Sequence, residues 1–169
     1  MATADFTTTI LVNQSPQKAY ESINNVRGWW SEEIEGGTSE PGDVFKYHFE
    51  DVHRCEMKLI EVIPAKRIVW LVLDNYFKFT KDQSEWKGTK IIFELTEKEG
   101  NTEIRFTHQG LVPAHECYEI CHSAWTNYIQ NSLHGLITNG KGKPNGKEKP
   151  QTKNEKQLLR ENAVEVKNK

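Results

Sequence analysis

Residues 113–138 read PAHECYEICHSAWTNYIQNSLHGLIT, and the periodicity of this stretch decides the fold. Its apolar side chains recur every three or four positions, which is typical of an amphipathic helix. The stretch ends before Asn139-Gly140, a pair typical of helix C-termini. A helix of this length spans a small domain, so we expect it to be the central packing element.

The chain before this helix alternates between apolar and polar residues in the manner of strands. This pattern predicts six strands, over residues 6–12, 43–50, 53–62, 67–74, 90–97 and 102–109. Ile60 and Val62 break the alternation of the third strand, which indicates a bulge or a second contact. Gly100-Asn101 favours a two-residue turn between the last two strands.

Two short helices are expected directly after the first strand. Ser15 suits the N-cap and Pro16 the first helical position of one of them, and residues 24–30 can form the other. The order of elements predicts an α+β domain: a curved antiparallel sheet of about six strands wrapped around the long C-terminal helix. Because sheet twist curves the concave face, a straight helix leaves a gap against it.

Several short motifs, in this order, carry a resemblance to known proteins. They are Ser15-Pro16, Trp29-Trp30, Pro41-Gly42-Asp43-Val44-Phe45, the segment 61–70 and Ala124-Trp125. Together they resemble the START-like helix-grip (SRPBCC) superfamily over residues 5–139, and most closely its activator of heat-shock-protein-90 ATPase homologue-like branch. The resemblance implies a hydrophobic cavity between sheet and helix, in a superfamily whose members range from lipid carriers and cyclases to co-chaperone domains.

The predicted interior is rich in flat rings, which either close on one another or line a cavity. We expect an accessible cavity of roughly 300 to 1,000 Å³, the usual size of a ligand site. Of the adjacent pair Trp29 and Trp30, one is expected to anchor the short helix and the other to lie near the cavity mouth; the alternative is that both only hold the loop against the domain. The candidate ligand-binding residues are Trp30, Phe45, Tyr47, Phe49, His53, Cys55, Trp70, Phe93, His108, Cys121, Trp125 and Tyr128.

Four side chains of the types that bind zinc are predicted to face this interior. His53 and Cys55 lie on one strand, and Cys117 and Cys121 lie four residues apart on the helix. A free cysteine on an apolar stripe is more often a small buried hydrophobe, so no metal and no cofactor are expected.

His53 and His108 are the ionisable side chains expected to point inward. A histidine in an apolar cavity can act as a general acid or base, but it is more often a structural hydrogen-bond partner. No carboxylate that could orient either ring is evident from the sequence. We therefore assign no catalytic residue, and an enzyme is less expected than a binding domain.

Charge divides the chain at about residue 140. Residues 141–169 carry nine Lys and Arg against four Glu and no aromatic residue, a net charge of +5, while residues 1–140 carry 13 basic and 20 acidic side chains, a net charge of −7. The composition predicts one domain over residues 1–140 and a flexible, Lys-rich, solvated tail over residues 141–169. The alternative is a short helix, built on Leu158-Leu159 and Ala163-Val164, that docks on the domain or on a partner.

Composition also limits location and partners. The tail lacks rings for base stacking, so no nucleic-acid partner is expected. No run approaches the ~18 apolar residues of a membrane span, and the N-terminus lacks the features of a secretory signal. Three cysteines are too few for a disulfide framework. These features predict a cytoplasmic protein without a membrane span.

Three functions remain open at this stage. The leading one is binding of a hydrophobic or amphipathic small molecule between sheet and helix. The second is a protein-interaction module, with a partner such as a chaperone. The third is a cyclase-like or hydrolase-like enzyme that uses the same cavity.

Overall fold

The structure, a computed structural model, describes residues 5–146 and 149–167, and for residues 162–167 the backbone alone. Seven strands form one antiparallel sheet in the order β1-β7-β6-β5-β4-β3-β2. Their bounds are β1 Phe6–Val12, β2 Glu35–Gly36, β3 Val44–Phe49, β4 His53–Ile63, β5 Arg67–Phe77, β6 Lys90–Lys98 and β7 Asn101–Gln109. Six of these are the predicted strands, and the two-residue β2 adds an edge beside β3.

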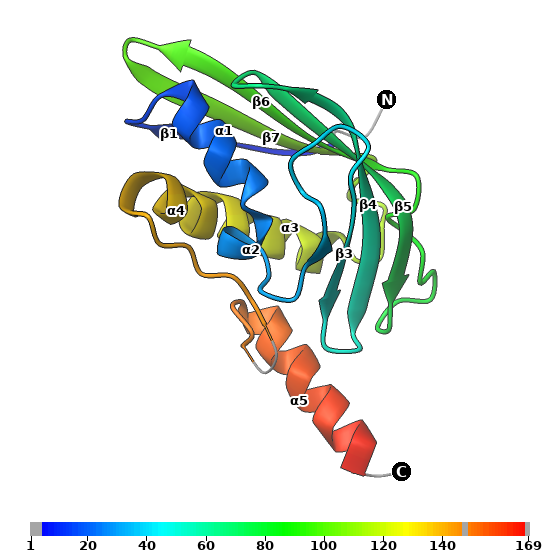
Figure 1. Cartoon of the computed structure of the whole chain (residues 1–169). Helices are drawn as coiled ribbons and strands as arrows, with labels where there is room; N and C mark the ends of the chain where they lie inside the picture. The colour runs from blue at the N-terminus through cyan, green and yellow to red at the C-terminus, as the bar shows by residue number, and fades with distance from the viewer. Residues whose placement is uncertain (1–4, 147–148, 168–169) are drawn as a thin grey trace.

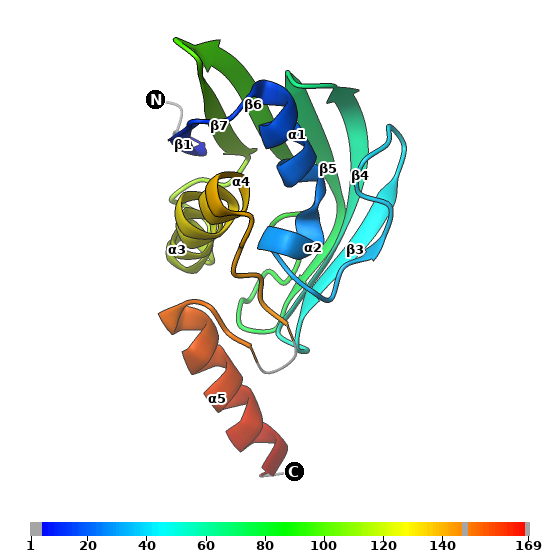
Figure 2. The same cartoon turned by 60° about the vertical axis from the view of Figure 1, so that its left-hand side comes forward.

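The sheet curves around the helices, as Figures 1 and 2 show. The helical segments are α1 Pro16–Asn24, α2 Val26–Trp29, α3 Tyr118–Asn127, the π-helical η1 Tyr128–Leu133, α4 His134–Asn139 and α5 Lys153–Lys167. The first begins as predicted, because Ser15 Oγ accepts a hydrogen bond from Lys18 N at 3.1 Å. The continuous helix α3-η1-α4 lies on the concave side of the sheet (Figure 2). The predicted α+β helix-grip fold is confirmed.

The long helix differs from the prediction at its start and in its middle. It begins at Tyr118 and not at residue 113, because the Glu85 carboxylate accepts hydrogen bonds from the backbone N–H groups of Glu116 and Cys117 at 2.9 and 3.0 Å. The turn that meets this carboxylate is not helical. In η1 the helix widens, and Ser132 Oγ donates to the backbone oxygen of Trp29 at 2.6 Å.

The strand details match the prediction in one place and correct it in another. The pairing of β4 with β5 shifts between Leu59 and Glu61, so the predicted bulge is confirmed. The hairpin turn, however, is formed by Glu99 and Gly100, with φ of 51° and 85°. It lies one residue before the predicted Gly100-Asn101, because pairing Leu95 with Ile104 keeps both side chains on the buried face.

The centre of the core is solid packing of rings. Trp70 on β5 packs nearly perpendicular to Phe45 on β3 and edge-on, at 62°, against Phe93 on β6, with ring centroids 5.1 Å apart in both pairs. All three side chains are fully buried. Trp29 packs on Phe93 and donates its indole N–H to the backbone oxygen of Ile23 at 3.0 Å. Trp29 is thus the tryptophan that anchors the short helix.

The segment after residue 140 does not behave as the predicted solvated tail. It runs back across α2 and the long helix before α5 leaves the domain, as Figures 1 and 2 show. Asn145 and Glu155 are buried, and Leu158 and Leu159 pack partly against the core. Polar contacts, described below, hold this segment, and composition alone does not reveal them.

Candidate ligand-binding pocket

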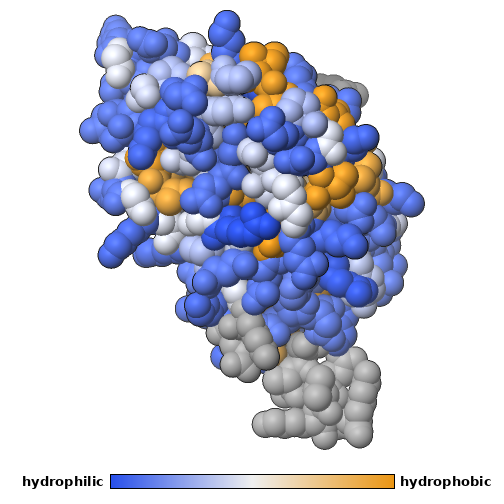
Figure 3. Space-filling view, viewed as in Figure 1, coloured by the Kyte–Doolittle hydropathy of each residue, from blue (hydrophilic) through white to orange (hydrophobic). Residues whose placement is uncertain are grey.

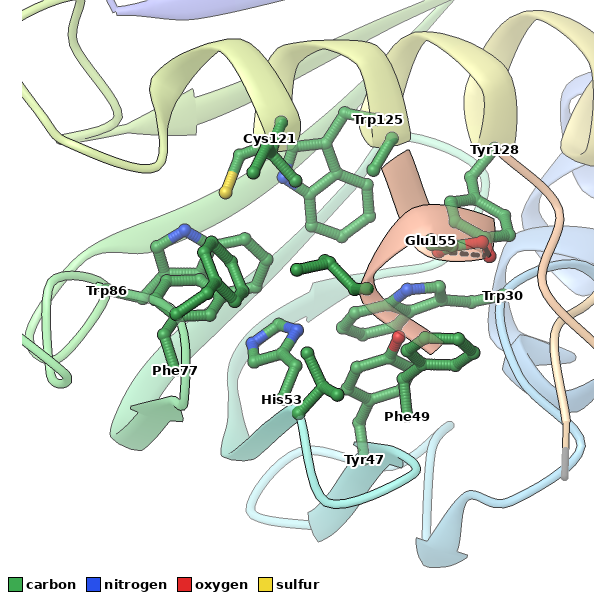
Figure 4. A pocket seen from close by; sticks show the side chains of 15 residues that line it. Trp30, Tyr47, Phe49, His53, Phe77, Trp86, Cys121, Trp125, Tyr128 and Glu155 are labelled. Atoms are coloured by element: carbon green, nitrogen blue, oxygen red, sulfur yellow. Dashed lines mark hydrogen bonds between the residues drawn. The ribbon is translucent and has the colours of Figure 1, made fainter. Parts of the chain in front are cut away.

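A small pocket opens between the curved sheet, the long helix and the start of α5 (Figure 4). Its enclosed volume is about 50 Å³, and about 490 Å³ of atom-free space lies within it when its open side is included. Its walls are mostly aromatic and aliphatic. They are formed by Trp30, Tyr47, Phe49, Val52, His53, Phe77, Phe79, Trp86, Ile120, Cys121, Ala124, Trp125, Tyr128, Glu155 and Leu158.

Four elements position most of these walls: β3, β4, the long helix and α5. The alternation of β3 and β4 turns Tyr47, Phe49 and His53 inward, and Figure 4 shows them below the cavity. One face of the long helix presents Cys121, Trp125 and Tyr128 from above. The first turn of α5 forms part of a further side, with Glu155 behind the cavity (Figure 4).

Seven of the twelve predicted ligand-binding residues line this pocket: Trp30, Tyr47, Phe49, His53, Cys121, Trp125 and Tyr128. The other five do not line it: Phe45, Cys55, Trp70, Phe93 and His108. Three of these form the solid ring packing of the core, so the pocket is smaller than predicted. Cys55 is buried opposite Tyr47 in the sheet pairing, and His108 lies behind Trp86 and Trp125.

His53 is held in one tautomer by its neighbour. Asn75 Nδ2 donates to the backbone oxygen of Gln83 at 3.3 Å, which turns Asn75 Oδ1 toward the imidazole. His53 Nε2 lies 2.9 Å from that oxygen, so it carries the proton and Nδ1 carries a lone pair. Burial lowers the pKa of His53 to about 3, so the ring is neutral near pH 7.

His108 is a structural histidine. Its Nδ1 accepts the indole N–H of Trp125 at 3.1 Å, and its Nε2 lies 2.8 Å from Thr89 Oγ1. Thr89 in turn donates to the backbone oxygen of Trp86. Burial lowers the pKa of His108 to about 3, and both ring nitrogens are engaged.

A second polar group joins the pocket to the C-terminal segment. Tyr128 donates its hydroxyl to Glu155, with oxygen distances of 3.0 and 2.8 Å (dashed in Figure 4). Asn145 Nδ2 donates to the hydroxyls of Tyr47 at 2.9 Å and Tyr128 at 2.8 Å. Burial raises the pKa of Glu155, and burial with nearby Glu155 raises the pKa values of both tyrosines.

A helix-capping motif in the sequence indicates where Glu155 lies, but the Lys-rich composition around it predicted a solvated tail. Thr152-Lys153-Asn154-Glu155 is a capping box: Glu155 N donates to Thr152 Oγ1 at 3.0 Å, and Thr152 N donates to Glu155 Oε1 at 3.2 Å. This motif marks the start of α5 and fixes its glutamate against Tyr128. Phe77 and Trp86, also missed, come from the end of β5 and the irregular loop after it, where periodicity gives no orientation.

The cysteines and histidines do not form a metal site. In the described parts of the chain, no three His, Cys, Asp or Glu side chains are grouped so that they could hold a metal ion. Cys55, Cys117 and Cys121 are buried free thiols, and burial raises the pKa values of Cys55 and Cys121. They pack as small apolar residues. No helix within the described ranges has the length and apolar character needed to cross a membrane.

The fold agrees with the comparisons with known proteins. The family described as "Activator of Hsp90 ATPase homolog 1-like protein" matches residues 18–138, well over half of the chain. The chain belongs to this family. The match confirms the resemblance drawn from the sequence motifs, and it ends just before the C-terminal segment that closes the pocket. No match was found among curated proteins.

Solved structures extend the comparison beyond the family. The chain is similar to the Aha1 dimer from Colwellia psychrerythraea, with 25% identity, a TM-score of 0.67 and coverage of 82% of this chain and 99% of that one. DynU16, from the dynemicin biosynthetic locus, shares the fold at 14% identity and a TM-score of 0.58, over 80% of this chain and 48% of its own. A conserved protein of unknown function from Enterococcus faecalis shares it at 15% identity and a TM-score of 0.57, over 96% of this chain and 84% of its own.

Proposed function

We propose that this protein binds a small, mainly apolar molecule in the pocket between sheet, long helix and α5. One observation carries the proposal: aromatic and aliphatic side chains wall a cavity that the ring packing of the core leaves open, and polar groups stand at two of its sides. Pockets of this composition are typical of small-molecule sites. The free cysteines support a reducing, cytoplasmic location as part of the same proposal.

Native mass spectrometry of protein purified from its own cells tests the proposal. We expect a retained small molecule that is lost in Ala124→Phe, because Ala124 lines the pocket and a phenyl ring there fills it. Ala114→Phe is the matched control, since Ala114 is exposed on the loop before α3. If both variants retain the molecule equally, the pocket is not its binding site. Binding of a hydrophobic probe that Ala124→Phe leaves unchanged leads to the same conclusion.

A protein-interaction role is the second candidate, and it is favoured by a different surface. Val44, Ile60 and Ile63 are more than a third exposed on the outer side of β3 and β4. Figure 3 shows hydrophobic residues as separate groups on a largely hydrophilic face. Since the family is named for activation of Hsp90, the ATPase rate of Hsp90 tests this role. A rate that the wild-type protein raises and that Ile60→Lys raises less supports it. A rate that neither protein changes contradicts it.

Catalysis is not part of the proposal. Within the described residues, His53 and His108 hydrogen-bond to amide, hydroxyl and indole groups, and neither is paired with a carboxylate. Both rings are neutral, with pKa values of about 3. A general acid or base needs a pKa nearer to the working pH.

A further inference from the structure

The polar groups around the pocket differ in whether they have a hydrogen-bonding atom free for a ligand. Tyr128 donates to Glu155 and accepts from Asn145. Glu155 Oε1 also accepts from the backbone N–H groups of Gln151 and Thr152, at 2.7 and 3.2 Å. Two wall residues are different. Only Nε2 of His53 has a partner among the described residues, and the indole N–H of Trp86 is buried without an acceptor. His53 Nδ1 is thus the available acceptor.

Whether His53 Nδ1 is a donor or an acceptor follows from the hydrogen bonds of Asn75. Gln83 orients Asn75, and Asn75 accepts the Nε2 proton of His53, so Nδ1 is an acceptor. Phe77, Trp86 and Tyr47 surround the imidazole, with ring centroids 4.3, 4.7 and 5.1 Å away. An acceptor in such apolar surroundings discriminates strongly between a ligand that donates a hydrogen bond and one that does not.

The space beside His53 is too small for more than one ring. Its enclosed volume is about 50 Å³, and the atom-free space reaches about 490 Å³ only when the open side is included. Cavities on the order of 150 Å³ hold benzene, so a single ring here also occupies part of the open side. The walls are rings that favour edge-to-face or offset contacts with a further flat ring. Glu155, the carboxyl group in the wall, disfavours a ligand that is itself an anion.

We propose that the pocket selects neutral, single-ring aromatic molecules that carry one O–H or N–H donor, with phenol as the simplest example, and that this donor binds His53 Nδ1. This inference rests on the binding function proposed above and adds the ligand class to it. It also assigns His53 as the specificity-determining residue, with Asn75 as the residue that positions it.

Binding of phenol, anisole and toluene to the whole protein, measured by calorimetry at pH 7, tests the inference. The three molecules have similar shapes, but only phenol donates a hydrogen bond. We expect phenol to bind at least tenfold more tightly than the other two. His53→Phe should abolish this preference, whereas His48→Phe, the same change at a half-buried histidine outside the pocket wall, should retain it.

The outcomes separate the two proposals. Equal binding of phenol and toluene overturns the ligand class and leaves the binding function standing. A phenol preference that His53→Phe retains overturns the role of His53. Failure of all three molecules to bind also overturns the ligand class, and the native mass spectrometry described above then decides whether the pocket binds another small molecule. If His53→Phe does not fold, the ¹⁵N resonances of His53 in the wild-type protein decide: phenol should shift Nδ1 and leave Nε2 protonated, and an unchanged Nδ1 overturns the inference.

Discussion

Glu155 is an ionisable residue that is packed in the interface between the domain and α5. Its carboxyl group is buried, it accepts hydrogen bonds from Tyr128 and from the first turn of α5, and burial raises its pKa. The titratable groups that face it are Tyr47 and Tyr128, whose raised pKa values keep both neutral. Ionisation of Glu155 therefore places a buried negative charge, stabilised by hydrogen bonds alone among these groups, at the joint between domain and α5.

Replacing Glu155 by Gln removes this ionisation and keeps the capping box, which accepts either residue at this position. Because the folded-state pKa lies above the unfolded value, the stabilisation by Glu155 is fully present below the ordinary Glu pKa of about 4.3 and is lost as pH rises through the folded pKa. Urea unfolding from pH 4 to 8 should show wild type losing stability relative to Glu155→Gln as pH rises. A constant difference between the two proteins contradicts this prediction.

The candidate site was only partly predictable at this scale. Strand alternation is enough to orient Tyr47, Phe49 and His53, because β3 and β4 are regular there. It cannot show that Trp70 finds ring partners on both sides, because that depends on distances between strands. Glu155 was missed because its burial depends on Tyr128, 27 residues earlier in the chain.

At the scale of elements, the contact between the C-terminal segment and the helices depends on Gly142. A Cβ atom at this position would lie 2.1 Å from the backbone oxygen of Gly28 in α2 and 3.2 Å from that of Ser132 in η1. Lys143 N also donates to Ser132 Oγ at 2.7 Å. The backbone of the segment thus lies directly on both helices, with no room for a side chain.

Gly142→Ala should therefore push the segment off the helices and destabilise the protein by about 1–3 kcal/mol, the usual effect of overpacking. Gly146→Ala is a matched control, because a Cβ atom there meets only the flexible end of Glu32 at 3.0 Å. We expect the control to change stability by less than about 0.5 kcal/mol. Thermal unfolding followed by circular dichroism measures both, and equal melting temperatures would show that the segment does not lie on the helices.

The elements themselves were largely predictable from sequence, with instructive exceptions. The strands and α1 follow from local patterns such as Ser15-Pro16. The start of α3 does not, since it depends on Glu85 from a distant loop. Nor does the π-helical turn, because Tyr128, Ile129 and Leu133 are buried at spacings that an α-helix also gives.

At the scale of the whole molecule, the domain and its C-terminal segment differ in composition but share a buried interface. The segment supplies Asn145 to the tyrosine hydroxyls and Leu158 to the pocket wall. Its net charge of +5 opposes the −7 of the preceding residues, which favours the same association. A sequence-based boundary at residue 140 follows composition and separates residues that pack together.

Truncation after Gly140 tests whether the segment is a structural part of the domain. Because it removes the hydrogen bonds of Asn145 and Glu155 and uncovers Trp30 and Tyr128, we expect a loss of roughly 2–4 kcal/mol in the free energy of unfolding. The opened pocket should also increase the fluorescence of a hydrophobic dye. Truncation after Glu161 is the control, since it removes none of these contacts and should melt like the full chain. If both truncated proteins melt alike and bind dye alike, the segment is a solvated tail after all, and the pocket has no wall on that side.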